Sequence, residues 1–129
     1  MPPAARRDAI GSHPSKPEGL EFPRAARLVR RGEFDAVYRT GKRRSNSHFT
    51  VFFRANQLPQ SRFGFSIKKA IGGAVVRNRI RRRVREVVRI HRQEIAAGWD
   101  FVVHPKKVVA RAEFELLTAE FLKLVRSGM

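Results

Sequence analysis

The sequence has no cysteine among its 129 residues. Disulfides, thiolate zinc sites and a cysteine nucleophile are therefore excluded, and the composition fits a reducing cytoplasm. No apolar run approaches the roughly 18–20 residues that span a membrane. The first 23 residues hold five of the seven prolines and no continuous apolar stretch typical of a secretory signal. We predict that residues 1–23 form a disordered, proline-rich tail and that a single domain spans residues 24–129.

Acidic residues are also scarce. Eleven Asp and Glu stand against 28 Lys and Arg, which gives a formal net charge of +17. Such a surplus repels itself in a folded domain, so we expect a polyanionic partner, with nucleic acid first and an anionic membrane second. The acids show no paired spacing such as D-x-D, and the four histidines are scattered. Because a two-metal hydrolase needs convergent carboxylates, we predict neither catalytic residues nor metal ligands in the protein.

The hydrophobic pattern predicts helices packed on one small sheet, which is an α+β sandwich of two layers. The two longer β-favouring runs are separated by a short turn with Asn56 and Pro59, so we predict that they pair as an antiparallel hairpin. In chain order the predicted elements are a helix that ends at Gly41, strands over 41–45, 48–54 and 62–68, a helix over 74–95, an interior strand over 100–104, and a closing helix containing Leu117 and Phe121.

Residues 77–92 carry eight arginines in sixteen positions, with Glu86 as the one acid. At 100° per residue, a stripe of Val76, Ile80, Val84, Val87 and His91 lies on one side, and we predict that it packs on the sheet. Asn78, Arg82, Arg85 and Arg89 fall on the opposite side. A merely solvated helix face mixes acids with bases, whereas neighbouring arginines repel each other by tenths of a kcal/mol per pair. The planar guanidinium favours phosphates and bases over a lipid surface, so the pattern predicts nucleic-acid binding.

An ordered motif extends upstream of this helix. Residues 63–89 read FGFSIKKAIGGAVVRNRIRRRVREVVR, with a strand that ends in two lysines, a turn of small residues, and Arg-Asn-Arg opening the helix. This motif resembles the signature of the bacterial ribonuclease P protein, a subunit of the ribonucleoprotein that trims the 5′ end of precursor tRNA. GEFDAVY at residues 32–38 and DFVV at 100–103 are similar to the family's first helix and last strand. The resemblance covers about residues 24–126.

The resemblance implies a fold of the order α-β-β-β-α-β-α, related to a ribosomal-protein-like domain. It also implies a left-handed crossover around the arginine-rich helix. Pattern reasoning alone predicts the opposite hand, because right-handed crossovers make up about 98% of such connections.

The resemblance further implies a division of labour. The catalytic RNA subunit of ribonuclease P would perform the chemistry, and this accessory subunit would bind that RNA and the 5′ leader of precursor tRNA in the cytoplasm. Mg²⁺ would serve the holoenzyme and be bound mainly by RNA; we expect no membrane or DNA partner. The alternative is a non-enzymatic RNA-binding or ribosome-associated protein of the same fold.

The resemblance assigns two sets of site residues. Aromatic rings stack on unpaired bases for roughly 1–3 kcal/mol each without demanding a sequence, which suits a leader-binding cleft. By their chemistry alone, Phe34 and Phe49 fit a hydrophobic core equally well, and the roles of Tyr38 and Phe52 stay open. Asn78 would either cap the helix or hold a metal-bound water. The RNA-binding set is Lys68, Lys69, Arg77, Asn78, Arg79, Arg81, Arg82, Arg85 and Arg89, and the leader-binding set is Phe34, Tyr38, Phe49 and Phe52.

Overall fold

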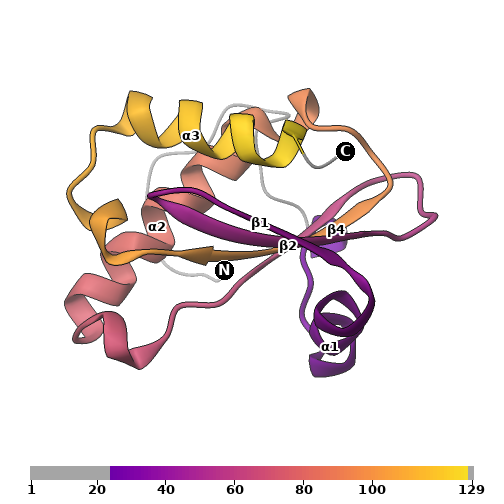
Figure 1. Ribbon diagram of the computed structural model, residues 1–129, viewed down its shortest axis with the longest axis horizontal. Helices are drawn as coiled ribbons and strands as arrows, with labels where there is room; N and C mark the ends of the chain where they lie inside the picture. The colour runs from indigo at the N-terminus through magenta and orange to yellow at the C-terminus, as the bar shows by residue number, and fades with distance from the viewer. Residues whose placement is uncertain (1–23, 128–129) are drawn as a thin grey trace.

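The computed structural model describes residues 24–127, in which a small sheet carries α2 and α3 on one face and α1 on the other (Figure 1). The predicted order α-β-β-β-α-β-α is confirmed. The predicted tail over residues 1–23 lies outside the described residues. The elements are η1 (Arg24–Ala26), α1 (Arg31–Thr40), β1 (Lys42–Ser45), β2 (Phe49–Ala55), β3 (Arg62–Phe65), η2 (Lys69–Ile71), α2 (Ala74–His91), η3 (Arg92–Glu94), β4 (Trp99–Pro105), η4 (Lys107–Ala110) and α3 (Phe114–Ser127), where η marks a 3-10 helix.

The strands are ordered β1-β2-β4-β3, so the predicted hairpin between β2 and β3 is wrong. β4 lies between them, antiparallel to β2 and parallel to β3. The physical reason is burial: Phe101, Val102 and Val103 of β4 are 0% exposed. A strand this apolar is most stable when both its faces and both its edges are covered. The prediction that β4 is interior is confirmed.

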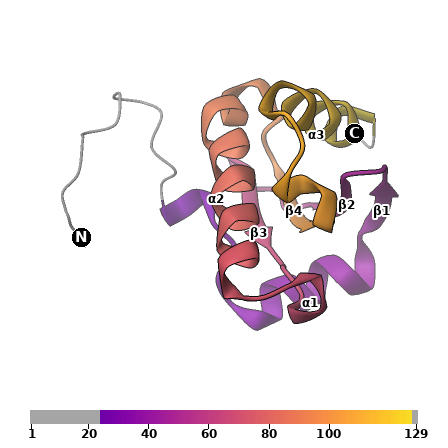
Figure 2. The same cartoon turned by 90° about the vertical axis from the view of Figure 1, so that its left-hand side faces the viewer.

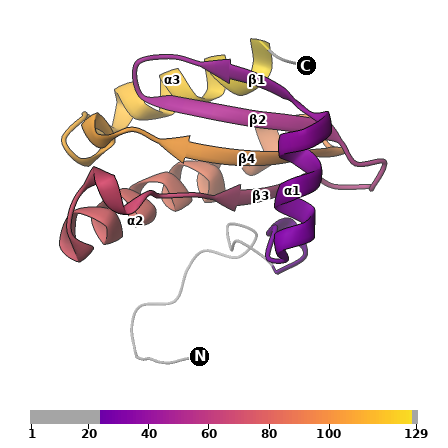
Figure 3. The ribbon, with the colours of Figure 1, turned by 60° about the horizontal axis from the view of Figure 1, so that its bottom comes forward.

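The connection from β3 through α2 to β4 joins two neighbouring parallel strands. In Figure 3 the arrows of β3 and β4 point the same way, with α1 in front of the sheet and α2 behind it. Followed along the chain, this path is left-handed. The hand implied by the family resemblance is therefore confirmed, and the opposite hand favoured by general statistics is wrong for this chain.

The two faces of the sheet bury different clusters. Phe49, Val51 and Phe53 alternate along β2 with less buried residues and belong to the main core beneath α2 and α3. A smaller cluster beneath α1 contains Val37 and Val102, with Phe34 and Phe52 packed against it. Gly64 on β3 makes this contact close, since a Cβ there would lie 2.5 Å from the ring of Phe34. α1 crosses the sheet near one end and covers only part of this face (Figure 3).

The predicted buried stripe of α2 is confirmed at Ile80, Val84 and Val87, each 0% exposed. His91 differs, because its side chain is 22% exposed and its Nδ1 lies 2.6 Å from a carboxylate oxygen of Glu94. The helix ends at this residue, four positions earlier than predicted, and a 3-10 turn follows. None of the helices in residues 24–127 combines the length and the apolar composition that crossing a membrane requires.

Candidate nucleic-acid interface

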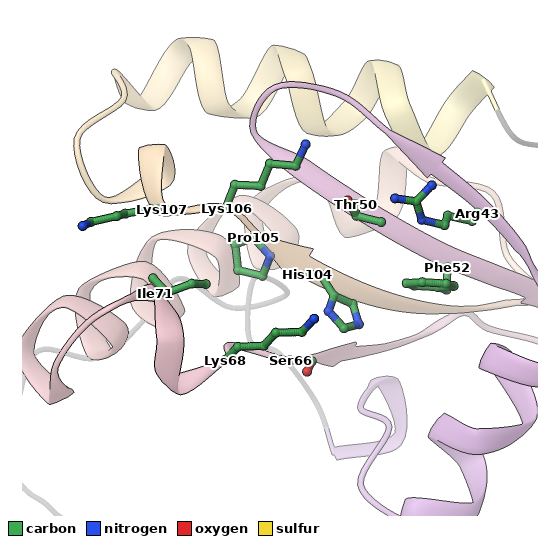
Figure 4. Close-up of a pocket in the computed structure, with 10 residues that line it drawn as sticks. All are labelled: Arg43, Thr50, Phe52, Ser66, Lys68, Ile71, His104, Pro105, Lys106 and Lys107. Carbon is green, nitrogen blue, oxygen red and sulfur yellow. The ribbon is translucent and has the colours of Figure 1, made fainter.

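A cleft of about 440 Å³ opens on the face of the sheet that α1 leaves uncovered (Figure 4). Four of its ten lining residues are cationic and none is acidic. The cations reach the cleft from β1, the segment after β3, and the segment after β4. The lining residues are Arg43, Thr50, Phe52, Ser66, Lys68, Ile71, His104, Pro105, Lys106 and Lys107.

Strand register sets the floor of the cleft. Phe52 of β2 pairs with Arg43 of β1 on one side, and Thr50 pairs with His104 of β4 on the other. Because paired residues project from the same face of a sheet, these side chains come together on the open face. Their odd-numbered neighbours on β2 point into the main core instead.

Three rings from three elements meet at the edge of this cleft. Tyr38 of α1 packs edge-on against Phe52, with ring centroids 5.0 Å apart, and Phe52 lies 5.3 Å from the ring of His104. The Tyr38 hydroxyl lies 2.8 Å from Nε2 of His104. We call Tyr38, Phe52 and His104 the aromatic triad. Such a surface offers flat apolar area beside hydrogen-bonding groups, which suits unpaired bases.

The electrostatics of the triad keep it neutral near neutral pH. Burial, and then the nearby charge of Lys68, lower the pKa of His104 below its ordinary 6.5. Burial also raises the pKa of Tyr38, with a smaller contribution from Asp35, although a hydrogen bond with Ser66 opposes it. The neutral phenol can therefore donate to the unprotonated Nε2 of His104. The cleft thus combines a neutral aromatic floor with a cationic rim.

Only two of the four predicted leader-binding aromatics meet here. Tyr38 is 38% exposed and Phe52 partly exposed. Phe34 packs beneath α1 against Gly64. Phe49 is 0% exposed and lies on the opposite face, where its ring centroid is 5.5 Å from that of Phe121. Phe34 and Phe49 therefore pack in the hydrophobic clusters, as their chemistry also allowed, and neither lines the cleft.

His104 was not among the predicted site residues. The signal that could have found it is alternation along the last strand, which places positions 100, 102 and 104 on one face. Without knowing that β4 inserts beside β2, the sequence does not show which aromatic residues share that face.

The second surface is the N-terminal half of α2, which Figure 2 views from the outside. Here Asn78, Arg79, Arg81 and Arg82 are all exposed, and Lys68 and Lys69 are exposed just before the helix. We call these six residues the basic surface. Asn78 does not cap α2, because Gly73 is the N-cap; the Asn78 side-chain oxygen accepts a hydrogen bond from Arg81 at 2.8 Å.

The remaining predicted arginines of α2 are less accessible. Arg77 donates from Nε to the carbonyl of Gly72 at 3.0 Å. Arg89 is 12% exposed and pairs with Glu86 through two nitrogens. Burial lowers the pKa of Arg85, with further contributions from the charges of Arg27 and Arg81. The segment around Arg27, which bridges to β3, therefore lies near the side of α2 that the helical projection predicted to be open.

Within residues 24–127, no three His, Asp or Glu side chains gather closely enough to hold a metal ion.

Comparison with known proteins supports the same family from two directions. A family model described as Ribonuclease P matches residues 22–127. The ribonuclease P protein component of Bacillus cereus is 37% identical over 112 residues, covering 85% of this chain and 94% of that protein. The corresponding component of Desulfovibrio desulfuricans is 39% identical over 109 residues, covering 81% and 84%.

Solved structures agree with the sequence matches. The RNase P protein from Thermotoga maritima superposes with a TM-score of 0.72 at 34% identity, covering 78% of this chain and 96% of that one. A Staphylococcus aureus RNase P protein superposes with a TM-score of 0.73 at 25% identity, covering 80% and 87%. The chain therefore belongs to the ribonuclease P protein family, the protein components of a tRNA-processing ribonucleoprotein.

Proposed function

We propose that the protein binds the catalytic RNA of ribonuclease P through the basic surface of α2 and the unpaired 5′ leader of precursor tRNA in the aromatic cleft. Holding both RNAs on one domain would position the leader junction for cleavage by the RNA subunit. The observation that carries this proposal is the pairing, in one small domain, of an aromatic, acid-free cleft with an exposed row of arginines. The chemistry and the functional Mg²⁺ would reside with the RNA.

The cleft fits a single strand better than a duplex. Bases of any identity can stack on Phe52 and the exposed part of Tyr38, since every base has an apolar face. Arg43, Lys68 and Lys106 surround these rings and could follow the phosphates of the same strand. A site of this kind recognises a leader without reading its sequence, as a subunit that serves many precursors requires.

The basic surface fits structured RNA. Guanidinium groups form two parallel hydrogen bonds with a phosphate, so exposed arginines such as Arg79 and Arg82 can grip neighbouring backbone positions. Asn78 orients a third exposed arginine, Arg81, because the Asn78 side-chain oxygen accepts a hydrogen bond from it. The opposite side of α2 is anchored in the core by Ile80 and Val84, which presents the cations on a rigid support.

The experiment compares two substrates of the reconstituted holoenzyme: precursor tRNA with a 5′ leader, and mature tRNA. Replacing Phe52 by Ala removes stacking area from the cleft, so affinity for the precursor should fall roughly 10-fold or more, while affinity for mature tRNA stays unchanged. Tyr38→Ala should act in the same direction. Equilibrium binding with labelled RNAs measures both affinities.

Leu58→Ala is the matched control, since Leu58 is a 42% exposed apolar residue in the turn between β2 and β3, outside the cleft. This variant should bind both substrates like the wild type. Thermal unfolding of each variant shows whether the fold is retained. Equal weakening for precursor and mature tRNA in the Phe52 variant would return that residue to a purely structural role.

A further inference from the structure

A second hollow, of about 530 Å³, lies between the first turns of α2 and the 3-10 helix η4. It shares only Lys107 with the aromatic cleft, which we call the leader cleft after its proposed ligand. We call it the valine groove. Its lining residues are Val75, Val76, Arg79, Lys107, Val108, Ala110 and Arg111.

The apolar side chains of the groove are unusually open. Val75 is 82% exposed and Val108 is 46% exposed, whereas Val76 packs against the main core below them. Exposing a valine side chain to water is unfavourable. Two exposed valines in one hollow therefore offer an apolar surface to a ligand. The core would lose little if Val75 and Val108 were polar, so folding does not explain their identity.

The rim has one sign of charge. Arg79 belongs to α2, Lys107 begins η4 and Arg111 follows it, while no acid lines the groove. An apolar floor between cations matches a nucleotide, whose base is flat and apolar and whose phosphates carry a negative charge on each side. The volume lies within the roughly 300–1,000 Å³ of sites that enclose small ligands. An acidic peptide would need its charges spaced to meet this short rim.

We propose that the valine groove holds an unpaired nucleotide of the catalytic RNA, with its base against Val75 and Val108 and its flanking phosphates on Arg79, Lys107 and Arg111. The inference rests on the proposed function and extends it, because it adds an apolar anchor to a contact otherwise made by charge. The groove and the leader cleft share Lys107, so an RNA seated here lies next to the strand bound in the cleft.

The test separates apolar from ionic contributions to affinity for ribonuclease P RNA. The double variant Val75→Ser and Val108→Ser keeps every charge but loses apolar contact area, so its affinity should fall roughly 5- to 30-fold while the salt dependence of log K stays as in the wild type. Arg79→Gln should instead reduce the salt slope by about one unit. Leu58→Ser, which removes a comparably exposed apolar side chain elsewhere, is the control and should bind normally.

A direct readout uses the absence of cysteine from the chain. Val108→Cys and Leu58→Cys each introduce a unique thiol. Bound RNA should slow alkylation of the first thiol at least several-fold and leave the second unchanged. Both exposed positions tolerate small residues, and thermal unfolding verifies the fold of each variant.

The outcomes distinguish the two claims. If the wild-type protein does not bind the RNA, the proposed function fails. If the wild type binds but the double serine variant binds equally well, or the Val108→Cys thiol stays reactive in the complex, the groove is not an RNA site and only this inference is overturned. A lower salt slope in the serine variant would also contradict it, because the loss would then be ionic.

Discussion

Phe52 packs against both other rings of the aromatic triad, one supplied by α1 and one by β4. Its neighbours hold each other through the Tyr38 hydroxyl and Nε2 of His104, which orients both rings without using a charge. A neutral, pre-oriented floor loses little conformational entropy when a base stacks on it. The cationic residues of the rim then add attraction for any strand, whatever its sequence.

His104 should make the stability of the protein depend on pH. Because burial and Lys68 lower its pKa in the folded state, the unfolded chain takes up the proton more readily. The free energy of unfolding therefore contains a His104 contribution that is complete above the unfolded pKa of 6.5 and is lost as the pH falls below it. In His104→Asn the loss of stability between about pH 7.5 and about pH 5 should be smaller than in the wild type.

Urea denaturation at the two pH values measures this difference. Tyr38→Phe serves as the control, because it removes the hydrogen bond to the imidazole but keeps the titrating group in its buried position. An identical acid-induced loss in the wild type and in His104→Asn would show that His104 does not contribute.

At this scale, chemistry was easier to predict than placement. Phe49 and Phe52 stand three positions apart in one strand, so alternation places them on opposite faces of the sheet. Which of those faces carries the cleft depends on where α1 and β4 pack. His104 acquires its role from Tyr38, 66 residues away. Arg89 lies on the side of α2 that the helical projection assigns to RNA, but its guanidinium group pairs with the Glu86 carboxylate. Local patterns cannot resolve such choices, because each depends on a partner distant in sequence or on a competing neighbour.

At the scale of elements, α1 lies beside the leader cleft, where Tyr38 contacts Phe52. An ionic cluster ties α1 to the sheet. Arg62 of β3 contacts the Asp100 carboxylate of β4 at 2.9 and 2.7 Å and Glu33 of α1 at 2.8 Å. Hydrogen bonding to Asp100, outweighing burial, raises the pKa of Arg62. Burial raises the pKa of Glu33, but the amides of Arg30 and Val29 and the charge of Arg62 outweigh it, so that pKa is lowered.

Arg62→Met should destabilise the protein by on the order of 3 kcal/mol, because it leaves the Asp100 carboxylate, 4% exposed, without its cation. Glu33→Gln should cost about 1 kcal/mol or less, since that pair is more exposed. Urea denaturation measures both values. Equal effects of the two substitutions would contradict the conclusion that the Asp100 carboxylate, the more buried of the two, depends most on Arg62.

The basic surface of α2 should govern how binding to the catalytic RNA responds to salt. Replacing Arg81 and Arg82 by Gln removes two exposed cations, so the slope of log K against log salt should fall by about two units, one for each phosphate contact. Lys123→Gln with Arg126→Gln removes the same charge from the far end of α3 and should leave the slope near that of the wild type. Equal slopes for both double variants would mean that overall charge, not this surface, attracts the RNA.

Element order and type follow well from periodicity, because α2 and β2 each bury a regular face. Strand pairing does not. Two β-favouring runs joined by a short turn resemble a hairpin, and only the greater burial of β4, some 35 residues later in the chain, explains why it separates them. Arg85 of α2 is likewise partly buried near Arg27. A helical projection cannot predict this contact, because it contains only the residues of the helix itself.

For the whole molecule, the formal charge is +17, and within residues 24–127 the cations have a spatial order. α2 and α3 cover one face of the sheet and α1 covers part of the other (Figure 1). The leader cleft opens on the remaining part of the α1 face. Cations gather around the cleft, along the first half of α2 and at η4. In the proposed function, these surfaces would bind structured RNA and a single strand at once. We therefore propose that this domain bridges the catalytic RNA and its substrate.

The most direct test is the rate at which ribonuclease P RNA removes the 5′ leader of labelled precursor tRNA at low Mg²⁺, with and without the protein. The wild type should increase this rate, and Arg79→Gln with Arg81→Gln and Arg82→Gln should lose most of the increase while retaining the fold. The Lys123 and Arg126 double variant should act like the wild type. No increase with the wild-type protein, or a full increase with the triple variant, would contradict the account.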